Sequence, residues 1–274
     1  MSYIEYVDTA DFYSERAVST APLPSMHSHG SYEIYYLAKG EREYFIEDRF
    51  FMVEEGDMVL IPRRVLHRTA GEGGLRYLVH FSEKFLKNFF TETTVKALLK
   101  KEPVVFRGDS RDKEQIQSIM DTILTEYTRA EKENLPQNET LLSGYVYQLL
   151  FLFANGQNYY VPGHGDNDRI TGIIQYINEN YNHITDIEQI AEKFYISKFH
   201  LCRTFRKHLG VPLVAYLNTI KIREACNMMR KGSADMTQIA MDCGFNSPSY
   251  FCKVFKKERG ISPSEYRRKH STKN

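Results

Sequence analysis

Several hallmarks of secreted and membrane proteins are missing from this 274-residue sequence. The longest apolar stretch, residues 145–154, is about half as long as a membrane span, and the acidic first residues lack the basic start and apolar run of a signal peptide. Only four cysteines occur, none in a C-x-x-C pair, so we expect reduced thiols rather than disulfides or zinc ligands. They are Cys202, Cys226, Cys243 and Cys252. These absences predict a cytoplasmic protein with no membrane partner.

The sequence also has almost no net charge, +1, but its charges are unevenly distributed. Residues 168–274 carry 18 basic and 10 acidic side chains, whereas residues 1–167 carry 18 and 25. A basic C-terminal region following an acidic N-terminal region favours a polyanionic partner for the C-terminal region. Charge alone fits a solvated basic surface equally well, so sequence motifs have to decide between the two.

What the N-terminal third does contain is a series of short segments rich in Tyr, Phe, Val and Ile. Gly40, the turn at 54–57 and the Gly-rich segment at 71–74 separate them. The segments are YEIYYLA, REYFI, RFFMV, DMVLIP and LRYLVHF. Many short strands joined by tight turns predict an all-β barrel or jelly roll.

Helical patterns follow the predicted strands. Residues 112–133 place Ile116, Ile119 and Ile123 on one face at helical spacing. Residues 138–155 are more apolar than a one-sided surface helix should be. These helices could cover the core of the barrel or form a dimer face, and we favour the dimer face.

A segment without periodicity, rich in Gly, Asn and Asp, precedes the last third of the chain. We take residues 156–168 from it as the linker between two domains. The N-terminal domain, residues 1–155, is then the sensing and dimerisation domain. Residues 169–274, in which every segment reads as helix, form the C-terminal domain.

The C-terminal domain contains an internal repeat. HLCRTFRKHLGVPLVAYL (200–217) aligns without gaps with YFCKVFKKERGISPSEYR (250–267) at an offset of 50 residues. Upstream the offset is 49, so the second copy has one extra residue in its turn. Each copy reads as short helix, turn and longer helix, which predicts helix-turn-helix motifs at about 188–209 and 236–259.

Local signals support these helices. Ser197 and Ser247 are placed to cap the longer helix of each copy, and Gly244 can close the shorter helix of the second copy. Residues 212–232 are predicted to form one long helix between the copies. This helix could hold the two helix-turn-helix motifs at a fixed separation.

The longer helix of each copy has two faces. Pairs of apolar residues four apart, Leu201 with Phe205 and Phe251 with Phe255, are expected in the core. A solvated basic helix could explain one outward face, but recurrence in the same motif favours contacts with bases and phosphates. The predicted DNA-contacting residues are Phe199, Cys202, Arg203, Arg206, Lys207, Ser249, Cys252, Lys253, Lys256 and Lys257.

Residues 239–269 (IAMDCGFNSPSYFCKVFKKERGISPSEYRRK) resemble the second helix-turn-helix of the AraC/XylS transcription regulators, and residues 190–210 resemble the first. The Cys-Gly-Phe, Ser-x-Ser-Tyr-Phe, Phe-Lys-Lys, Gly-x-Ser-Pro and Tyr-Arg elements sit at the spacing of that family. The resemblance implies double-stranded promoter DNA and RNA polymerase as partners. Pro248 and Tyr250 lie where members vary most, so the resemblance does not give the operator sequence.

Metal-binding residue types gather near the predicted start of the barrel. His27, His29 and Glu33 are all odd-numbered, so in an unbulged strand they would share one face, and His67 follows a later turn. His27, His29, Glu33 and His67 are therefore candidate ligands for a divalent transition metal such as Zn, Ni, Mn or Fe. A metal is the one cofactor that the sequence suggests, and it is not required.

The same residues resemble the two cupin motifs. His-x-His-x3-Glu-x6-Gly is met at every position, and Gly-x5-Pro-x-Gly-x2-His is met except that Arg64 replaces a glycine. The resemblance implies a pocket in the barrel that binds a small effector, for which a sugar is our first expectation. The predicted pocket residues are His27, His29, Glu33, Tyr35 and His67, with Tyr35 stacking on the apolar face of the sugar.

Together these patterns predict an α+β protein. Its N-terminal part is a β jelly-roll, cupin-like barrel with a helical dimerisation segment, and its C-terminal part is an all-α tandem helix-turn-helix domain. The expected function is that of a homodimeric, sequence-specific activator of transcription controlled by a sugar-like effector. One alternative is a metal-dependent cupin enzyme whose DNA-binding tail only localises it. Another is an effector-independent regulator with a degenerate barrel.

Overall fold

The structure is a computed structural model, and it describes residues 4–7, 11–19, 26–47, 49–70, 74–99, 102–155, 168–231 and 235–270. The chain forms two compact units. One comprises Val7–Leu23 and Ser28–Gly163, and the other comprises Met1–Tyr6, Pro24–His27 and His164–Asn274. Most of the predicted linker, residues 156–167, lies outside the described residues.

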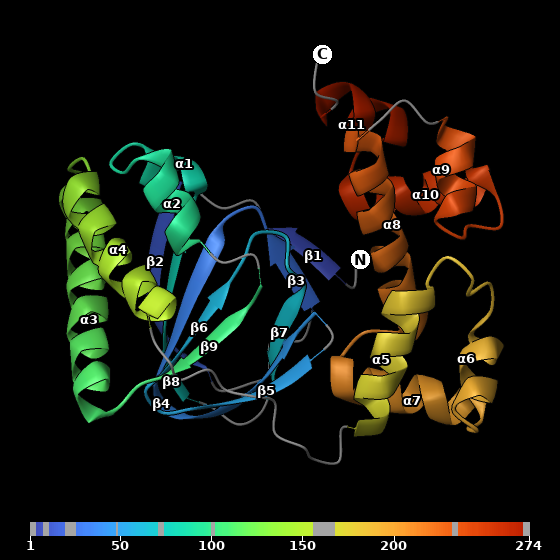
Figure 1. The fold of residues 1–274 in the computed structure, drawn as a ribbon, viewed down its shortest axis with the longest axis horizontal. Coiled ribbons are helices and arrows are strands. Elements are labelled where there is room, and N and C mark those ends of the chain that lie inside the picture. Colours follow the sequence, from blue (N-terminus) through green and yellow to red (C-terminus); the bar gives the residue numbers. More distant parts are fainter. Residues whose placement is uncertain are drawn as a thin grey trace. The chain divides into compact units, whose positions relative to one another are not determined.

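The β domain is built on one sheet (Figure 1). Its strands are β1 (Ile4–Val7), β2 (Phe12–Ser19), β3 (Met26–His29), β4 (Tyr32–Ile46), β5 (Arg49–Glu54), β6 (Asp57–Ile61), β7 (His67–Ala70), β8 (Gly74–Phe81) and β9 (Val104–Arg107). The strand order is β1-β3-β7-β4-β6-β9, with β5 and β8 also paired to β4, and β2 paired to β8. All four pairings of β4 are antiparallel, and the predicted β domain is confirmed.

Strand β4 corrects one expectation. We predicted two strands with a turn at Gly40, but a single strand runs through Gly40, whose φ is +101°. The register against β8 shifts between Leu37 and Lys39, which marks a bulge. Glycine tolerates the positive φ, so the strand can bend without ending. Its first half pairs with β6 and β8, and its second half pairs with β5 and β7.

Alternate residues of β4 enter two different cores. Ile34 and Tyr36 belong to the outer core, which packs the sheet against four helices. These are α1 (Glu83–Lys87), α2 (Glu92–Leu98), α3 (Ser110–Glu133) and α4 (Glu139–Asn155). Tyr35 and Leu37 belong instead to an inner core with residues from β5, β6, β8 and β9.

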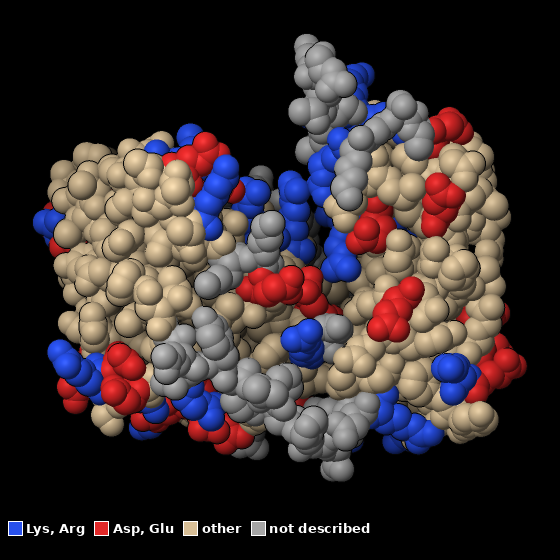
Figure 2. Space-filling view, viewed as in Figure 1, with Lys and Arg blue, Asp and Glu red and all other residues tan. Residues whose placement is uncertain are grey.

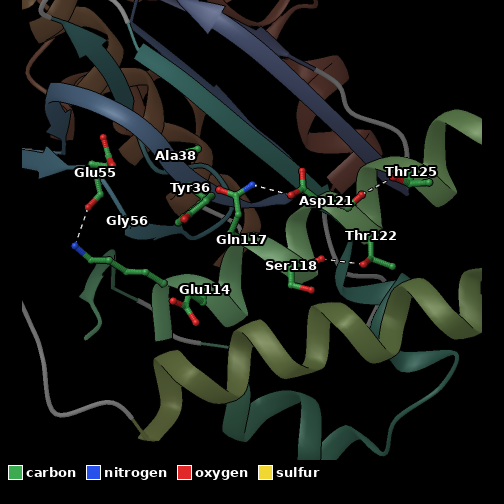
Figure 3. A pocket seen from close by; sticks show the side chains of 11 residues that line it. Tyr36, Ala38, Glu55, Gly56, Glu114, Gln117, Ser118, Asp121, Thr122 and Thr125 are labelled. Carbon is green, nitrogen blue, oxygen red and sulfur yellow. Dashed lines mark hydrogen bonds between the residues drawn. The ribbon is translucent and has the colours of Figure 1, made fainter. Parts of the chain in front are cut away.

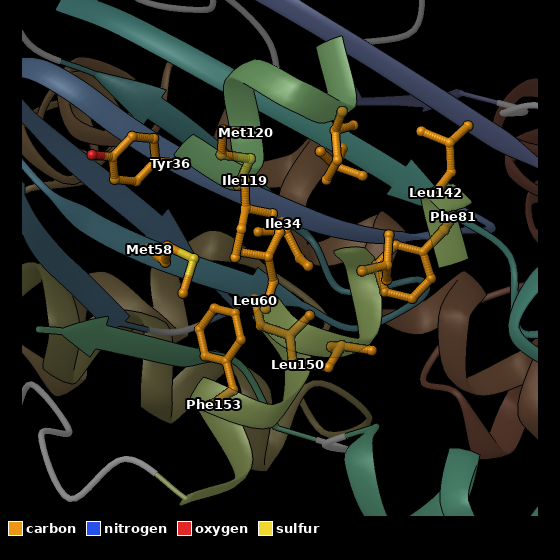
Figure 4. Packing of buried hydrophobic residues seen from close by; sticks show 14 of the residues in the cluster. Ile34, Tyr36, Met58, Leu60, Phe81, Ile119, Met120, Leu142, Leu150 and Phe153 are labelled. Atoms are coloured by element: carbon orange, nitrogen blue, oxygen red, sulfur yellow. The ribbon is translucent and has the colours of Figure 1, made fainter. Parts of the chain in front are cut away.

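The outer core uses most apolar positions of the predicted helix pair. Ile119 of α3, together with Leu142, Leu150 and Phe153 of α4, packs against strand residues such as Ile34 (Figure 4). The sequence left open whether these helices cover the core of the barrel or form a dimer face. The side chains named here cover the core.

The second unit is all-helical after Asp168, as predicted. Its helices are α5 (Asp168–Asn180), α6 (Ile187–Lys193), α7 (Lys198–Leu209), α8 (Leu213–Lys231), α9 (Met236–Asp242), α10 (Pro248–Arg259) and α11 (Pro263–His270). Helices α6 and α7 form the first helix-turn-helix, and α9 and α10 form the second. The turn between α9 and α10 is one residue longer than the turn between α6 and α7, as the change of offset predicted.

Capping explains where the longer helices begin. The Ser197 hydroxyl accepts from the backbone N–H of His200, and the Ser247 hydroxyl accepts from that of Tyr250, so both predicted caps are confirmed. Pro248 occupies the first turn of α10, where its missing N–H costs no helical hydrogen bond.

The inward faces of α7 and α10 also match the prediction. Leu201 and Phe205 are fully buried, as are Phe251 and Phe255. The four cysteines are free, and in the part of the chain that the structure describes no helix is long and apolar enough to cross a membrane.

Candidate effector site and DNA-binding surface

Helix α7 presents an outward face opposite its buried pair. Arg203, Arg206 and Lys207 are exposed, Phe199 is 77% exposed, and Cys202 is half-buried at the edge. Exposed basic side chains on one face of a capped helix suit contacts with phosphates and base edges.

Helix α10 repeats this face. Ser249, Cys252, Lys253, Lys256 and Lys257 are all exposed. The three lysines occupy the positions that Arg203, Arg206 and Lys207 occupy in α7, at an offset of 50 residues.

Two aromatic residues near these helices were not predicted as site residues. Tyr195, in the turn before α7, has a φ of +53° and is 94% exposed, and Tyr250, in the first turn of α10, is 44% exposed. The exposure of Tyr195 depends on the turn geometry, which hydrophobic periodicity does not indicate. Tyr250 lies three residues before Lys253 in α10, so helical spacing could have placed it on the outward side.

A buried lysine joins the linking helix to both motifs. The Lys221 ammonium of α8 donates to the carbonyl of Ile184, which precedes α6, at 2.8 Å. It also donates to the carbonyl of Gly244, in the turn of the second motif, at 2.5 Å. Burial lowers the pKa of Lys221 to about 8. Lys221 thus fixes α8 to the segment before the first helix-turn-helix motif and to the turn of the second.

In the β domain, three imidazoles surround one carboxylate. The Oε2 atom of Glu33, on β4, lies 3.0 Å from Nε2 of His29 and 3.5 Å from Nε2 of both His67 and His80. Its Oε1 accepts from the Tyr44 hydroxyl at 2.9 Å. All five side chains are buried.

His29 and Glu33 lie on two different strands and not on the single strand expected from the sequence, although the structure does bring the candidate residues together. Strand β3 ends at His29 and β4 begins at Tyr32, with a bend at residues 30–31. Candidate ligand atoms fall into two groups that share Glu33, and the atoms of each group lie within 4.8 Å of one another. They are His27, Glu33 and His67, and His29, Glu33 and His80. His27 is half-buried.

His80 and Tyr44 were missed from the sequence. His80 lies directly opposite Glu33 in the antiparallel pairing of β8 with β4. The alternation of LRYLVHF puts His80 on the same face as Leu78, which enters the inner core. This alternation could have indicated from the sequence that His80 faces the core. The register that places His80 opposite Glu33 depends on both strands and could not be predicted from either segment alone.

Tyr35, two residues after Glu33 on β4, lies on the same face of the strand. Its ring meets the ring of Tyr44 edge-on, with centroids 5.0 Å apart, and burial raises the pKa of Tyr35 to about 12. The hydroxyl is buried and has no hydrogen-bond partner among the described residues. Tyr35 is therefore part of the inner core in this structure, and its predicted stacking on a sugar requires that core to open.

The electrostatics of the cluster follow from burial and proximity. Burial alone would raise the pKa of Glu33, but the neighbouring imidazoles lower it well below its ordinary value. Burial lowers the pKa of His80 to about 4, so this ring is neutral at pH 7. Burial also opposes the charged form of His29, yet the hydrogen bond and charge of Glu33 raise the pKa of His29 overall.

A separate groove of about 720 Å³ lies on the other side of the sheet, between the turn that precedes β6 and helix α3 (Figure 3). Its lining includes Tyr36, Gln117, Asp121 and Thr125, and none of the predicted pocket residues. It opens to solvent, whereas the cluster around Glu33 is buried.

A cupin-like domain joined to two helix-turn-helix motifs is the architecture of a DNA-binding regulator with a ligand-binding domain. The family model of the AraC-like ligand binding domain matches residues 12–150, and that of a helix-turn-helix domain matches residues 190–269. The chain therefore belongs to the AraC family of helix-turn-helix transcription regulators.

Known proteins resemble the chain over most of its length. The HTH-type transcriptional activator RhaS of Escherichia fergusonii is 24% identical, covering 94% of this chain and 95% of RhaS. The lactose operon transcription activator of Staphylococcus xylosus is 25% identical, covering 88% of this chain and 85% of that protein. Among solved structures, ToxT of Vibrio cholerae is 15% identical over 96% of this chain and 99% of its own, with a TM-score of 0.37.

Proposed function

We propose that this chain activates transcription in response to a small effector and reads promoter DNA with helices α7 and α10. The observation that carries the proposal is the repeated outward face, in which Arg203, Arg206 and Lys207 recur as Lys253, Lys256 and Lys257. Two recognition helices held by one linking helix suit successive major grooves on one side of a duplex. Arg203 and Lys253 are assigned to base edges, and Lys207 and Lys257 to phosphates.

The effector is a sugar or a related metabolite bound in the β domain. The name of the relative from Staphylococcus xylosus links it to a lactose operon, which supports a sugar-related signal here. The carboxylate of Glu33 and the imidazoles of His29 and His67 can hydrogen-bond hydroxyl groups. Because these side chains are almost completely buried, a metabolite reaches them only if the barrel opens, and such an opening can transmit the signal.

The chain acts as a homodimer through the outward side of α4. Leu141, Gly144, Gln148 and Phe151 recur there at alternating spacings of three and four residues, the spacing at which two helices interlock. A Cβ atom added at Gly144 would meet nothing within 4 Å, so a second helix can approach closely. Figure 2 shows an almost uncharged surface over α4. This seam is narrower than the 112–155 region expected from the sequence, because the core uses the other apolar positions.

No catalytic role is proposed, since the relatives described above are transcription regulators. As an activator, the bound chain would contact RNA polymerase. Its place of action is then the cytoplasm, where a promoter-binding regulator meets its DNA.

A promoter-reporter assay tests the proposal. Full-length protein is expressed with its own upstream DNA fused to a reporter, and a panel of sugars is added one at a time. At least one sugar should raise reporter output, and His29→Ala should abolish the response while gel-shift affinity for the same DNA is unchanged. Repression, or a response that survives His29→Ala, would contradict the proposal.

A further inference from the structure

We propose that His29, Glu33 and His80 form a binding site for a divalent transition metal, with His67 beside it. This inference concerns the protein without effector and does not depend on the proposed function. It differs from the site expected from the sequence, because His80 belongs to neither cupin-like motif and His27 is not included.

The spacing of the ligand atoms fits such an ion. Zinc and similar metals bind imidazole nitrogen and carboxylate oxygen at about 2.0–2.2 Å, which puts tetrahedral ligands roughly 3.3–3.6 Å apart. Oε2 of Glu33 lies 3.5 Å from Nε2 of His80, within that range. It lies 3.0 Å from Nε2 of His29, a hydrogen-bond distance that has to widen slightly for an ion to lie between them. Nε2 of His67 is 3.5 Å from the same oxygen, close enough to become a fourth ligand after a small ring movement.

The tautomers of two imidazoles are fixed by backbone carbonyls. Nδ1 of His29 lies 2.9 Å from the carbonyl oxygen of Ser31, and Nδ1 of His67 lies 3.0 Å from that of Val65. A carbonyl only accepts, so each Nδ1 carries the proton and donates it. In the neutral rings, both Nε2 lone pairs then face the Glu33 carboxylate. In that form both lone pairs are available to a metal ion, which would replace the proton of the 3.0 Å hydrogen bond between Nε2 of His29 and Oε2 of Glu33.

The atoms around the ligands complete the geometry of a metal site. The Tyr44 hydroxyl donates to Oε1 of Glu33, so the carboxylate presents Oε2 to the three imidazoles, where an ion would lie. The Ser31 hydroxyl lies 3.3 Å from Nδ1 of His80, while its carbonyl accepts from His29, so one residue orients both imidazoles. Metal-ligating histidines almost always have such partners on their second nitrogen.

Burial distinguishes an ion from a larger ligand here. The exposed fractions of His29, Glu33 and His80 are 1%, 2% and 8%. A single ion can occupy the space among three buried side chains that a sugar cannot enter without opening the barrel. The donor set of two nitrogens and one oxygen selects a transition metal over Mg²⁺, which prefers oxygen ligands.

The test is metal binding by full-length protein after treatment with a chelator. Co²⁺ is titrated and followed by its visible d–d absorption, and Zn²⁺ bound per chain is measured by elemental analysis. We expect one ion per chain and a rise in thermal unfolding temperature with Zn²⁺ but not with Mg²⁺. Ser31→Ala should weaken binding roughly 10–100-fold, because it removes an orienting partner of His80.

Matched variants decide between the two groups of ligands. His80→Gln and Glu33→Gln should abolish the Co²⁺ spectrum, whereas His27→Gln should keep it. Circular dichroism shows whether each variant is folded, and the wild-type stoichiometry alone still tests the site if one is not. Absence of bound metal in folded wild type would overturn the inference, as would binding lost in His27→Gln but kept in His80→Gln. Neither result bears on DNA binding or on the response to a sugar, which the reporter and gel-shift assays test independently.

Discussion

The ammonium of Lys221 lies 2.5 Å from the carbonyl oxygen of Gly244, so the linking helix α8 holds the turn of the second helix-turn-helix directly. The same ammonium binds the carbonyl of Ile184, next to the first motif, at 2.8 Å. Neither carbonyl keeps this donor if the lysine is lost. This buried side chain therefore helps to hold the two helix-turn-helix motifs at a fixed separation.

Lys221→Met is expected to destabilise the helical unit by about 1–3 kcal/mol, because one buried and one half-buried carbonyl lose a donor. Urea unfolding followed by circular dichroism measures this loss. Lys193→Met, on the exposed side of α6, is the control and should stay close to wild type. Equal effects of the two substitutions would contradict the linking role of Lys221.

The stability contributed by Lys221 should also depend on pH. Its pKa is lowered from an ordinary 10.5 to about 8, so between these values the unfolded chain binds more protons than the folded chain. Stability relative to Lys221→Met therefore rises with pH in this window, by up to about 1.4 kcal/mol per pH unit. Urea titrations of both proteins at several pH values from 7.5 to 10 check the sign. A constant difference would show that the folded pKa is not lowered.

Two glycines with similar backbone angles should respond differently to alanine. Gly244 and Gly260 have φ values of +75° and +73°, but a Cβ at Gly244 would lie 2.4 Å from the backbone oxygen of Asn182. A Cβ at Gly260 would meet nothing within 4 Å. Gly260→Ala should lower the free energy of unfolding by about 1–2 kcal/mol, because alanine is strained in the left-handed conformation. Gly244→Ala should cost clearly more, and equal thermal shifts would contradict the close approach.

Base and phosphate contacts should separate in binding assays. Arg203→Ala and Lys253→Ala are expected to reduce discrimination between the operator and random DNA by about 1–3 kcal/mol each. Lys207→Ala and Lys257→Ala should weaken binding to the operator and to random DNA equally, and should reduce the salt dependence of binding. Lys96→Ala in helix α2 removes one exposed charge from the other unit and serves as the control. Fluorescence anisotropy at several salt concentrations measures these effects, and equal losses on both DNAs for Arg203→Ala would refute its assignment.

The dimer seam is tested on α4. Phe151, which is 49% exposed, should be essential to the interface, so Phe151→Asp should give monomers at micromolar concentration without loss of fold. Leu135, at 51% exposure, lies off the seam, and Leu135→Asp should leave the dimer intact. Sedimentation velocity measures the oligomeric state of wild type and of both variants. A wild type that sediments as a monomer would remove the proposed interface.

The helical unit was largely predictable because its determinants are local. The offset between the copies placed both motifs, and Ser197 and Ser247 marked the starts of α7 and α10. The buried pair Leu201 and Phe205 followed from helical spacing alone. Lys221 was not predictable as a link, because its two acceptors lie 37 and 23 residues away in the chain.

The β domain was predictable in class but not in detail. Its site depends on pairings between distant segments, such as Glu33 with His80, which no single strand encodes. The odd numbering of His29 and Glu33 on one assumed strand correctly predicted that the two side chains lie close together. The strand assumption itself was wrong, because the chain bends before Tyr32. The sequence predicts a turn at Gly40, whereas in the structure this glycine bends a strand that continues.

Footprinting on the upstream DNA of the gene tests the central claim most directly. Full-length wild type should protect two segments centred about one helical turn, roughly 10 base pairs, apart for each bound chain. The protection should disappear in the double variant Arg203→Ala, Lys253→Ala at the same concentration. No protected segment with folded wild type, or an unchanged footprint with the double variant, would contradict DNA reading by α7 and α10.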